Sequence, residues 1–431
     1  MSLIKDPVVQ TGDWKRRLDV IVSTMRDISL HTDPQEMVRT YASRMREILP
    51  VDASMSLSRR DLPPPNYRIT RSTLWTEIIN PWKERNRLPI LQGGMLGELI
   101  YGDQPRVIDD LEVAPNDPAR KYFEGMRSMI ALPNFENGEA LNMVLLMRKQ
   151  RAAFRREELP ELVWMSNLFG RATSTLVISS ELRNAYHMLD EELKTVADIQ
   201  RSLLPATLPR VPNLDIAAYY HTSQRAGGDY YDFFQLRDGK LGMLIADVSG
   251  HGTPAAVVMA ITHAIAHMLP DPKCCPGVML TEINRHLTER YTASGSDFVT
   301  AFYGVYDPPS RSFTYACAGH NPPRLKSCTT GTMSSLDAVS DIPLGIFDNI
   351  QYKTATRNFR PGDQIVFYTD GITEASAPDG SLFGADRLDH VLENCHLTAS
   401  GLIESVLDAV GQFTQDKPAT DDRTILVARV L

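Results

Sequence analysis

The stretch RAGGDYYDFF, residues 225–234, places two glycines directly before an acidic residue and then continues into aromatic residues. Tyrosine and phenylalanine are typical of β-strands, so Asp229 and Asp232 are expected at the start of a strand that borders the protein core. A carboxylate beside a core is costly unless something positive pairs with it. The stretch therefore indicates either a turn or one half of a site whose other half lies elsewhere in the chain.

Carboxylates at the ends of apolar runs recur further along the chain. KLGMLIADV, residues 240–248, and DQIVFYTD, residues 363–370, carry Asp247 and Asp370 at their ends, and ATDDRT, residues 419–424, precedes the final strand. Any single aspartate at a strand end is most often a turn former. The fourfold recurrence, with no lysine or arginine that recurs beside it, favours a shared cation, although spacing alone does not establish that the four positions converge.

The ligand chemistry indicates which cation would suit these positions. Oxygen ligands without a cysteine or histidine pattern favour Mg²⁺ or Mn²⁺ over structural zinc. The glycines beside the carboxylates let backbone and water approach such ions. Two ions that share a bridging water would lower the pKa of that water toward neutrality and make it a nucleophile for a phosphate ester.

Bulk properties are those of an ordinary globular protein. The chain has 431 residues, of which 43% are hydrophobic and 23% charged, and this length predicts two or three domains. The net charge of −8 gives no basic excess, which argues against a nucleic-acid partner. The chain starts without an apolar core of signal-peptide length, and no run approaches the ~18 apolar residues of a membrane span, so a cytoplasmic protein without membrane contact is expected. The five cysteines show no CxxC spacing and are expected to be reduced thiols.

The pattern of the chain divides it into three parts, residues 1–178, 179–205 and 206–431. The first part mixes amphipathic helices with two predicted strands, SMIALPNF at 128–135 and ALNMVLLM at 140–147, which a turn joins. The last part is rich in strands. The expected fold class is therefore α+β, with a helical linker between two domains.

The linker carries a heptad pattern. Apolar residues recur every seven positions at Leu182, Leu189, Val196 and Leu203. A second series, four residues after each of the first three, consists of Tyr186, Leu193 and Gln200. This spacing predicts either a short parallel coiled coil that joins two protomers and links two domains, or an amphipathic helix packed on a neighbouring domain. A polar residue on such a seam, here Gln200, sets the register at a cost in stability.

A helix is predicted at TPAAVVMAITHAIAHML, residues 253–269, with Thr253 as its N-cap and Pro254 at its first position. His263 and His267 stand four residues apart in this helix, which is metal-ligand spacing. The glutamate of an HExxH motif is absent and the helix is otherwise apolar. Both histidines are therefore interpreted as packing or surface residues.

Seven short motifs connect these patterns to a known family, and they occur in this order: IQRSLLP, GGDYYDFF, IADVSGHGTPAA, AGHNPP, YTDGITEA, LFG and DDRTILVARV. From about residue 195 to residue 431 the chain resembles the SpoIIE/RsbU branch of the PPM-type, metal-dependent serine/threonine protein phosphatases. The resemblance implies an α–β–β–α sandwich of two antiparallel sheets. It also implies two Mn²⁺ or Mg²⁺ ions at one edge of the sandwich.

The resemblance assigns roles to individual residues. It implies that four carboxylates bind the metal ions and are catalytic, those of Asp229, Asp247, Asp370 and Asp421. It also implies that the backbone carbonyl of Val248 binds a metal ion. Asp421 is preferred over Asp422 because the family motif places the ligand first in the pair.

Other residues near these motifs have two interpretations each. Asp232 is expected to be a structural hydrogen-bond acceptor, and the aromatic residues beside it to pack in the core or at its edge. Arg225 lies four residues before Asp229, where it would either grip a phosphate or remain an exposed surface arginine. His251 would either protonate a leaving group or belong only to the loop before the helix.

The first part of the chain resembles a GAF domain over about residues 15–178, a likeness carried by GMRSMIALP at 125–133 followed by a turn and an apolar strand. The resemblance implies a module that senses a small ligand or a partner, and the alternative is a dimerising domain without a ligand. No cysteine lies before residue 274, so a thioether-linked bilin has no anchor. A single imidazole, that of His31, does not favour haem.

Together these patterns predict a dimeric signalling phosphatase that hydrolyses phosphoserine or phosphothreonine on a protein. The resemblance implies a phosphorylated anti-anti-sigma (STAS) protein as the substrate, within partner-switching control of transcription. Two alternatives are a non-catalytic module that binds a partner through the same fold, and a metal-dependent hydrolase of small phosphate esters or nucleotides. The presence of all four metal aspartates argues against the non-catalytic module.

Overall fold

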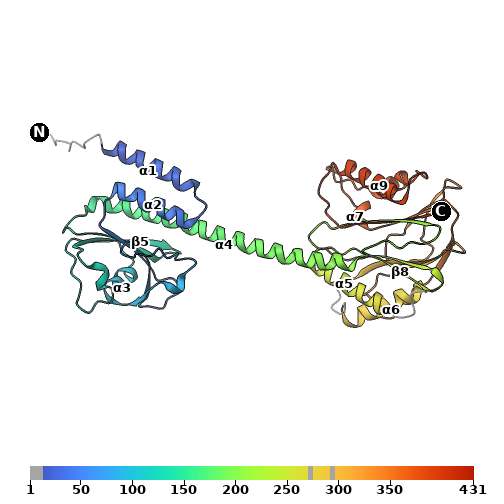
Figure 1. The fold of residues 1–431 in the computed structure, drawn as a ribbon, viewed down its shortest axis with the longest axis horizontal. Helices are drawn as coiled ribbons and strands as arrows, with labels where there is room; N and C mark the ends of the chain where they lie inside the picture. The colour runs from blue at the N-terminus through green and yellow to red at the C-terminus, as the bar shows by residue number, and fades with distance from the viewer. Residues whose placement is uncertain (1–12, 270–274, 292–296) are drawn as a thin grey trace, which may run out of the picture. The chain divides into compact units, whose positions relative to one another are not determined.

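The computed structural model describes residues 13–269, 275–291 and 297–431, and the chain forms two compact units (Figure 1). The first unit extends to Tyr186, and the second from His187 to Leu431. One long helix, α4 (Leu159–Leu203), begins in the first unit and ends in the second. Within the described ranges, no helix combines the length and the apolar character needed to cross a membrane.

The first unit is built on a six-stranded antiparallel sheet with the strand order β3-β2-β1-β6-β5-β4. Its strands are β1 (Ala53–Ser58), β2 (Asn66–Ser72), β3 (Ile90–Gln92), β4 (Arg106–Ile108), β5 (Ser128–Glu136) and β6 (Glu139–Arg148). The predicted pair of strands corresponds to β5 and β6, and Asn137 and Gly138 in their turn both have positive φ. The expectation of a hairpin at this place is confirmed.

Helices cover both faces of this sheet. They are α2 (Pro34–Ile48), α3 (Gly94–Tyr101) and the first part of α4, with short 3₁₀ segments at Arg85–Arg87, Arg120–Phe123 and Arg156–Glu158, while α1 (Asp13–Leu30) packs against α2. The Asp33 carboxylate caps α2 by accepting hydrogen bonds from two backbone N–H groups of its first turn. Leu99 of α3 belongs to the core on one face, and Leu162 of α4 packs on the other. Membership of the GAF family stays a prediction.

The second unit contains two five-stranded antiparallel sheets, with the strand orders β14-β11-β10-β9-β8 and β13-β12-β15-β16-β7. The first sheet is formed by β8 (Tyr230–Gln235), β9 (Leu241–Val248), β10 (Val299–Asp307), β11 (Ser312–Ala318) and β14 (Ala355–Asn358). The second is formed by β7 (Leu214–His221), β12 (Arg324–Lys326), β13 (Met333–Ser335), β15 (Gln364–Tyr368) and β16 (Arg423–Val430). A 3₁₀ segment, Arg237–Gly239, lies in the connection between β8 and β9.

The two sheets of the second unit pack face to face between two layers of helices. The helices are α5 (Thr253–Met268), α6 (Pro276–Arg290), α7 (Asp370–Thr373), α8 (Gly384–Val391) and α9 (Ala399–Thr414). Phe302 of β10 and Phe367 of β15 meet between the sheets, with ring centroids 5.8 Å apart. Figure 1 shows α5 and α6 on one side of the sandwich and α7 and α9 on the other. This is the α–β–β–α arrangement that the family resemblance implied.

The start of α5 differs from the prediction. The helix begins at Thr253, and its N-cap is Gly252, which has a φ of 77° and makes no side-chain capping bond. Thr253 as the N-cap is therefore wrong. The chain enters the helix through a positive φ, which glycine adopts at little steric cost.

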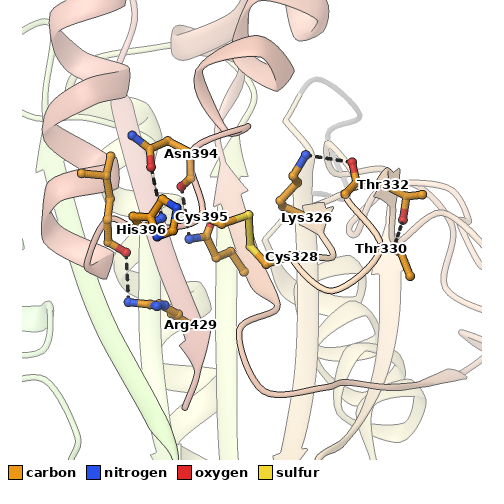
Figure 2. Close-up of a disulfide and its surroundings, with 11 residues drawn as sticks. Lys326, Cys328, Thr330, Thr332, Asn394, Cys395, His396 and Arg429 are labelled. Atoms are coloured by element: carbon orange, nitrogen blue, oxygen red, sulfur yellow. Dashed lines mark hydrogen bonds between the residues drawn. A yellow bond between two sulfur atoms is a disulfide. The ribbon is translucent and has the colours of Figure 1, made fainter.

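Two of the described cysteines form a disulfide, so the expectation of reduced thiols is wrong for them. Cys328 lies after β12 and Cys395 between α8 and α9, and their Cα atoms are 5.8 Å apart (Figure 2). This separation is usual for a disulfide, but the two residues are 67 positions apart in the sequence, so only the fold reveals the pairing. Cys275 and Cys317 are free thiols, and Cys274 lies outside the described residues.

Candidate active site

The first two predicted carboxylates lie opposite one another on neighbouring strands. In the antiparallel pair of β8 and β9, Tyr230 is paired with Ala246. Asp229, directly before β8, therefore faces Asp247 near the end of β9. On its other side Asp247 is paired with Thr300 of β10. The register of the sheet thus joins the RAGGDYYDFF stretch to the second acidic motif.

Asp370 and Asp421 come from neighbouring strands of the other sheet. β15 and β16 pair antiparallel, and the Thr369 N–H after β15 donates to the carbonyl of Thr424 over 3.1 Å. Asp370 follows directly as the first residue of α7, and Asp421 lies two residues before β16. Both carboxylates therefore leave their sheet at the same edge.

Two threonines of this second sheet hold Asp229 of the first. The hydroxyls of Thr369 and Thr424 donate to Asp229 Oδ2 over 2.8 and 2.5 Å, and the Thr424 N–H donates to Thr369 Oγ1 over 3.0 Å. All three side chains are buried. The sequence analysis singled out neither threonine, although each stands beside an acidic motif, in YTD and in DDRT.

The electrostatics of the carboxylates indicate that the two pairs lie close together. Burial raises the pKa of Asp247, and the charges of Asp229, Asp370, Asp421 and Asp422 raise it further. Burial is also the main cause of the raised pKa of Asp229, to which Asp422 and Asp370 add. The pKa of Asp370 rises to about 6, first through burial and then through the charge of Asp421. One cluster thus contains the four predicted aspartates and Asp422.

The adjacent aspartates at the start of β16 have different surroundings. Asp422 is buried, and its carboxylate accepts hydrogen bonds from the N–H groups of Ser223 and Gly228 and from the Ser223 hydroxyl. Asp421 is only partly buried, and its Oδ1 accepts a hydrogen bond from the Asp422 N–H. The carboxylate of Asp422 is thus hydrogen-bonded to the loop before β8. This favours Asp421 as the residue that would face a cation.

Close packing explains the two glycines before Asp229. A Cβ atom on Gly228 would lie 2.8 Å from the Val248 carbonyl oxygen, and one on Gly227 would lie 2.0 Å from Asp422 Oδ2. Both distances are too short for a non-bonded contact. The loop can therefore lie against the Val248 carbonyl, the backbone oxygen that the family resemblance assigns to a metal, only because these residues lack a side chain.

The C-terminal end of α4 contacts the same loop. Gln200 is buried, its Nε2 donates to the Gly227 carbonyl over 2.6 Å, and its Oε1 accepts from the Gly227 N–H over 3.0 Å. Arg225 forms two hydrogen bonds, of 3.0 and 2.9 Å, to the carboxylate of Asp190 on α4. Arg225 is half-exposed and paired with α4, as a surface arginine would be. The prediction that Gln200 sets the register of a coiled coil is wrong, because both ends of its amide are bonded to Gly227.

The carboxylate cluster suits hard divalent cations. Five carboxylates converge in it, and among the residues that the structure describes no lysine or arginine forms an ion pair with any of them. Like charges this close oppose one another unless a cation or protons neutralise them. Carboxylate and carbonyl oxygens are the donors that Mg²⁺ and Mn²⁺ prefer. The donor set therefore fits the ions that the sequence predicted.

Two histidines of the sequence motifs lie near the cluster. His251 is exposed, and its Nδ1 is 2.9 Å from Gln224 Nε2. His320 is buried, with its Nδ1 2.9 Å from Thr300 Oγ1, and burial lowers its pKa to about 4. His320 is therefore neutral near pH 7 and supplies no positive charge to the site.

Comparison with known proteins identifies the class of protein. The family model of Stage II sporulation protein E (SpoIIE) matches residues 237–431. Phosphoserine phosphatase RsbU of Bacillus subtilis (strain 168) is 32% identical over 248 residues, which cover 58% of this chain and 72% of RsbU. Phosphoserine phosphatase RsbP of the same organism is 29% identical over 189 residues, which cover 43% of this chain and 46% of RsbP.

A solved structure of a PP2C domain has a similar fold. The SiaA-PP2C domain of Pseudomonas aeruginosa matches with a TM-score of 0.50 and 20% identity, covering 57% of this chain and 99% of that domain. At this identity the likeness concerns the fold alone. The chain therefore belongs to the SpoIIE family of PP2C-type (PPM) protein serine/threonine phosphatases, as its motifs predicted.

Proposed function

We propose that the second unit hydrolyses phosphoserine or phosphothreonine on a regulatory protein, and that Asp229, Asp247, Asp370 and Asp421 hold two Mn²⁺ or Mg²⁺ ions for this reaction. The observation that carries the proposal is the convergence of carboxylates from both sheets of the sandwich in a chain of this family. Such ions, when bound, activate a water molecule and neutralise charge on a phosphate ester.

The residues of the cluster have separate tasks in this proposal. Asp247 and the Val248 carbonyl present two oxygens from the end of one strand. Thr369 and Thr424 fix the orientation of Asp229 from the opposite sheet. Supporting partners of this kind keep ligands in one geometry, and their loss typically weakens metal binding about 10–100-fold.

The names of the relatives support a proposal for the substrate class. RsbU and RsbP of Bacillus subtilis carry the name phosphoserine phosphatase. On this basis a phosphoserine side chain is the proposed target, and a phosphorylated STAS-domain protein of the anti-anti-sigma type is the proposed substrate, within partner-switching control. A non-catalytic binding module has less support, because the complete carboxylate cluster would be retained at a cost and without use.

A cavity in the first unit supports a ligand-sensing role for it. The cavity has a volume of about 450 Å³ and lies among residues of β1, β2, β5, β6, α2 and α4. Arg68 and Arg71 line it. Within the described part of the chain Arg68 Nε has no hydrogen-bond partner, and Arg71 donates to the uncharged Gln35. Burial lowers the pKa of Arg71 to about 10. These arginines favour a small anionic ligand over a domain that only dimerises.

The exposed face of α4 supports a homodimer. Leu182, Tyr186 and Leu189 are 54%, 65% and 51% exposed in the single chain, and their heptad spacing suits a second copy of the same helix. The bonds from Gln200 to Gly227 then offer a route by which a change in this helix reaches the loop before Asp229. The proposed signal is a change in the packing or register of the helix.

One comparison of substrates tests the proposal against its nearest alternative. Phosphate release is measured with a phosphoserine peptide and with a nucleotide at the same concentration, both with Mn²⁺. The proposal predicts a higher kcat/KM for the peptide. Preference for the nucleotide would instead identify a hydrolase of small phosphate esters.

A further inference from the structure

A second group of metal-ligating side chains lies outside the carboxylate cluster. His263 and His267 of α5 and Asp232 of β8 each offer one ligand atom, and these three atoms lie within 4.8 Å of one another. The α-helix places residues four apart on one face, and β8 runs beneath that face. Asp232 and two imidazoles of a later helix are thereby brought to one point.

We propose that Asp232, His263 and His267 form a binding site for a borderline divalent ion of the zinc class, distinct from the carboxylate cluster. Two imidazoles and one carboxylate are ligands that Zn²⁺ and related transition ions accept. The all-oxygen cluster at Asp229 instead suits Mg²⁺ or Mn²⁺. The chain would therefore hold two kinds of ion at two chemically different sites.

The strand geometry separates the two sites. Successive side chains of a strand point to opposite faces of the sheet. Asp229 points toward the other sheet, where Thr369 and Thr424 bond to it. Asp232, three positions later, points toward α5, where His267 Nε2 lies 2.6 Å from Asp232 Oδ2. The two carboxylates thus lie on opposite faces of the same sheet.

The carboxylate of Asp232 is already oriented. The Tyr230 hydroxyl donates to Asp232 Oδ2 over 2.6 Å, and the Phe233 N–H donates to Oδ1 over 2.7 Å. These contacts confirm Asp232 as a structural acceptor, and they are also the supporting bonds that a metal-binding carboxylate usually has. The side chain of Asp232 is only 7% exposed, and a carboxylate buried to this extent needs hydrogen-bond donors or a cation beside it.

The histidines are held beside this carboxylate and can be reached from solvent. The rings of His263 and His267 have centroids 4.4 Å apart, and Tyr230 packs edge-on against His263 at 5.7 Å. Burial and the nearby His267 lower the pKa of His263, which keeps a nitrogen lone pair available near pH 7. The side chain of His267 is 46% exposed, which gives an ion an entry path and room for a water ligand.

Metal coordination would require the three ligand atoms, now within 4.8 Å of one another, to adjust their spacing. Zn–N and Zn–O bonds of about 2.0–2.1 Å in a tetrahedral site place ligand atoms about 3.3 Å apart. The 2.6 Å contact between His267 and Asp232 must therefore open by about 0.7 Å, which the exposed His267 ring can accommodate. An ion at this point would replace the hydrogen shared by the two side chains, so binding would weaken as the pH falls.

Such an ion would tie α5 to β8 beside the phosphatase site. Asp229 lies directly before β8, and α5 begins five residues after Val248. An ion that joins the two elements would restrain both segments that leave the carboxylate cluster. The inference does not depend on the proposed phosphatase activity, because it concerns binding alone.

Calorimetric titration of the full chain with Zn²⁺ tests the site. The protein is first stripped with a chelator and then saturated with Mg²⁺ so that the carboxylate cluster is filled. One Zn²⁺ per chain is expected to bind the unaltered protein and to raise its melting temperature. His263→Ala and His267→Gln are each expected to weaken Zn²⁺ binding at least tenfold. Glutamine is chosen at position 267 because its amide can still donate a hydrogen bond to Asp232, which preserves the fold.

Three further variants separate this site from other zinc ligands. His390→Ala removes an 84% exposed histidine of α8 and is expected to leave Zn²⁺ binding unchanged. Asp247→Asn disables the carboxylate cluster, and Cys275→Ser removes an exposed thiol; both are expected to retain the Zn²⁺ site. Equal Zn²⁺ affinity in the His263 and His267 variants and the unaltered protein, or loss of binding in the Asp247 or Cys275 variant, would overturn the proposal.

Discussion

Replacing Asp247 by asparagine should abolish turnover and at the same time stabilise the metal-free protein. Burial and four neighbouring carboxylates raise the pKa of Asp247 in the folded state. A carboxyl group whose pKa is raised by folding opposes folding once the pH exceeds its unfolded value. Asparagine has nearly the same shape and carries no charge, so it removes one ligand oxygen and relieves the repulsion.

The size of the stabilisation follows from the pKa shift. One pKa unit corresponds to about 1.4 kcal/mol. Relief of the repulsion among these buried carboxylates is expected to stabilise the variant by about 1–3 kcal/mol in metal-free buffer at pH 7.5. For a unit of this size, that gain raises the melting temperature by roughly 2–10 °C. The loss of a ligand is expected to reduce kcat by at least about 100-fold with Mn²⁺, since even supporting residues are worth about 10–100-fold.

Two assays and one control check this prediction. Scanning calorimetry with EDTA gives the melting temperature, and phosphate release from a phosphoserine peptide with Mn²⁺ gives kcat. Asp238→Asn is the matched control, because Asp238 is exposed at the opposite end of the same hairpin and has a φ of 59°, which asparagine tolerates. Full activity of Asp247→Asn with Mn²⁺, or a lower melting temperature in EDTA, would refute the reasoning.

Three other predictions concern the helix and the pH dependence. Leu189→Glu on the exposed face of α4 should shift the mass measured by light scattering toward the monomer, whereas Lys194→Glu on the outer face should not; equal masses would dismiss the dimer. Gln200→Ala leaves the N–H and carbonyl of Gly227 without this partner, and should destabilise the second unit by about 1–3 kcal/mol and lower turnover; an unchanged calorimetric transition would contradict the contact. In EDTA the melting temperature should fall as the pH rises from about 4 to about 6, because folded Asp370, with a pKa of about 6, retains its proton over this range while the unfolded chain releases it; a rise in melting temperature there would contradict the placement of Asp370 among like charges.

The strands of the second unit and the acidic residues at their ends could be predicted from the sequence, because both depend on local patterns. The apolar run before Asp247 and the one before Asp370 each fold as the predicted strand. The role of Thr369 and Thr424 depends instead on the register between β15 and β16 and on the packing of that sheet against Asp229. No local pattern encodes such a contact.

Two of the remaining differences also arise from contacts between distant segments, and the third arises from a local turn. The heptad spacing placed Gln200 on a helix seam, but its amide bonds the backbone of Gly227, and the fold alone brings these residues together. The disulfide between Cys328 and Cys395 spans 67 residues, so cysteine spacing gave no sign of it. The cap of α5 was misplaced by one residue, because the positive φ of Gly252 is a feature of the turn rather than of the helix pattern.

The most direct test of the central claim is metal-dependent phosphate release by the full chain from a phosphoserine peptide. The same preparation is assayed with Mn²⁺, with EDTA, and with EDTA followed by excess Mn²⁺. The account predicts turnover with Mn²⁺, its loss in EDTA and its return when Mn²⁺ is restored. Turnover that persists in EDTA, or none in the presence of Mn²⁺, would contradict it.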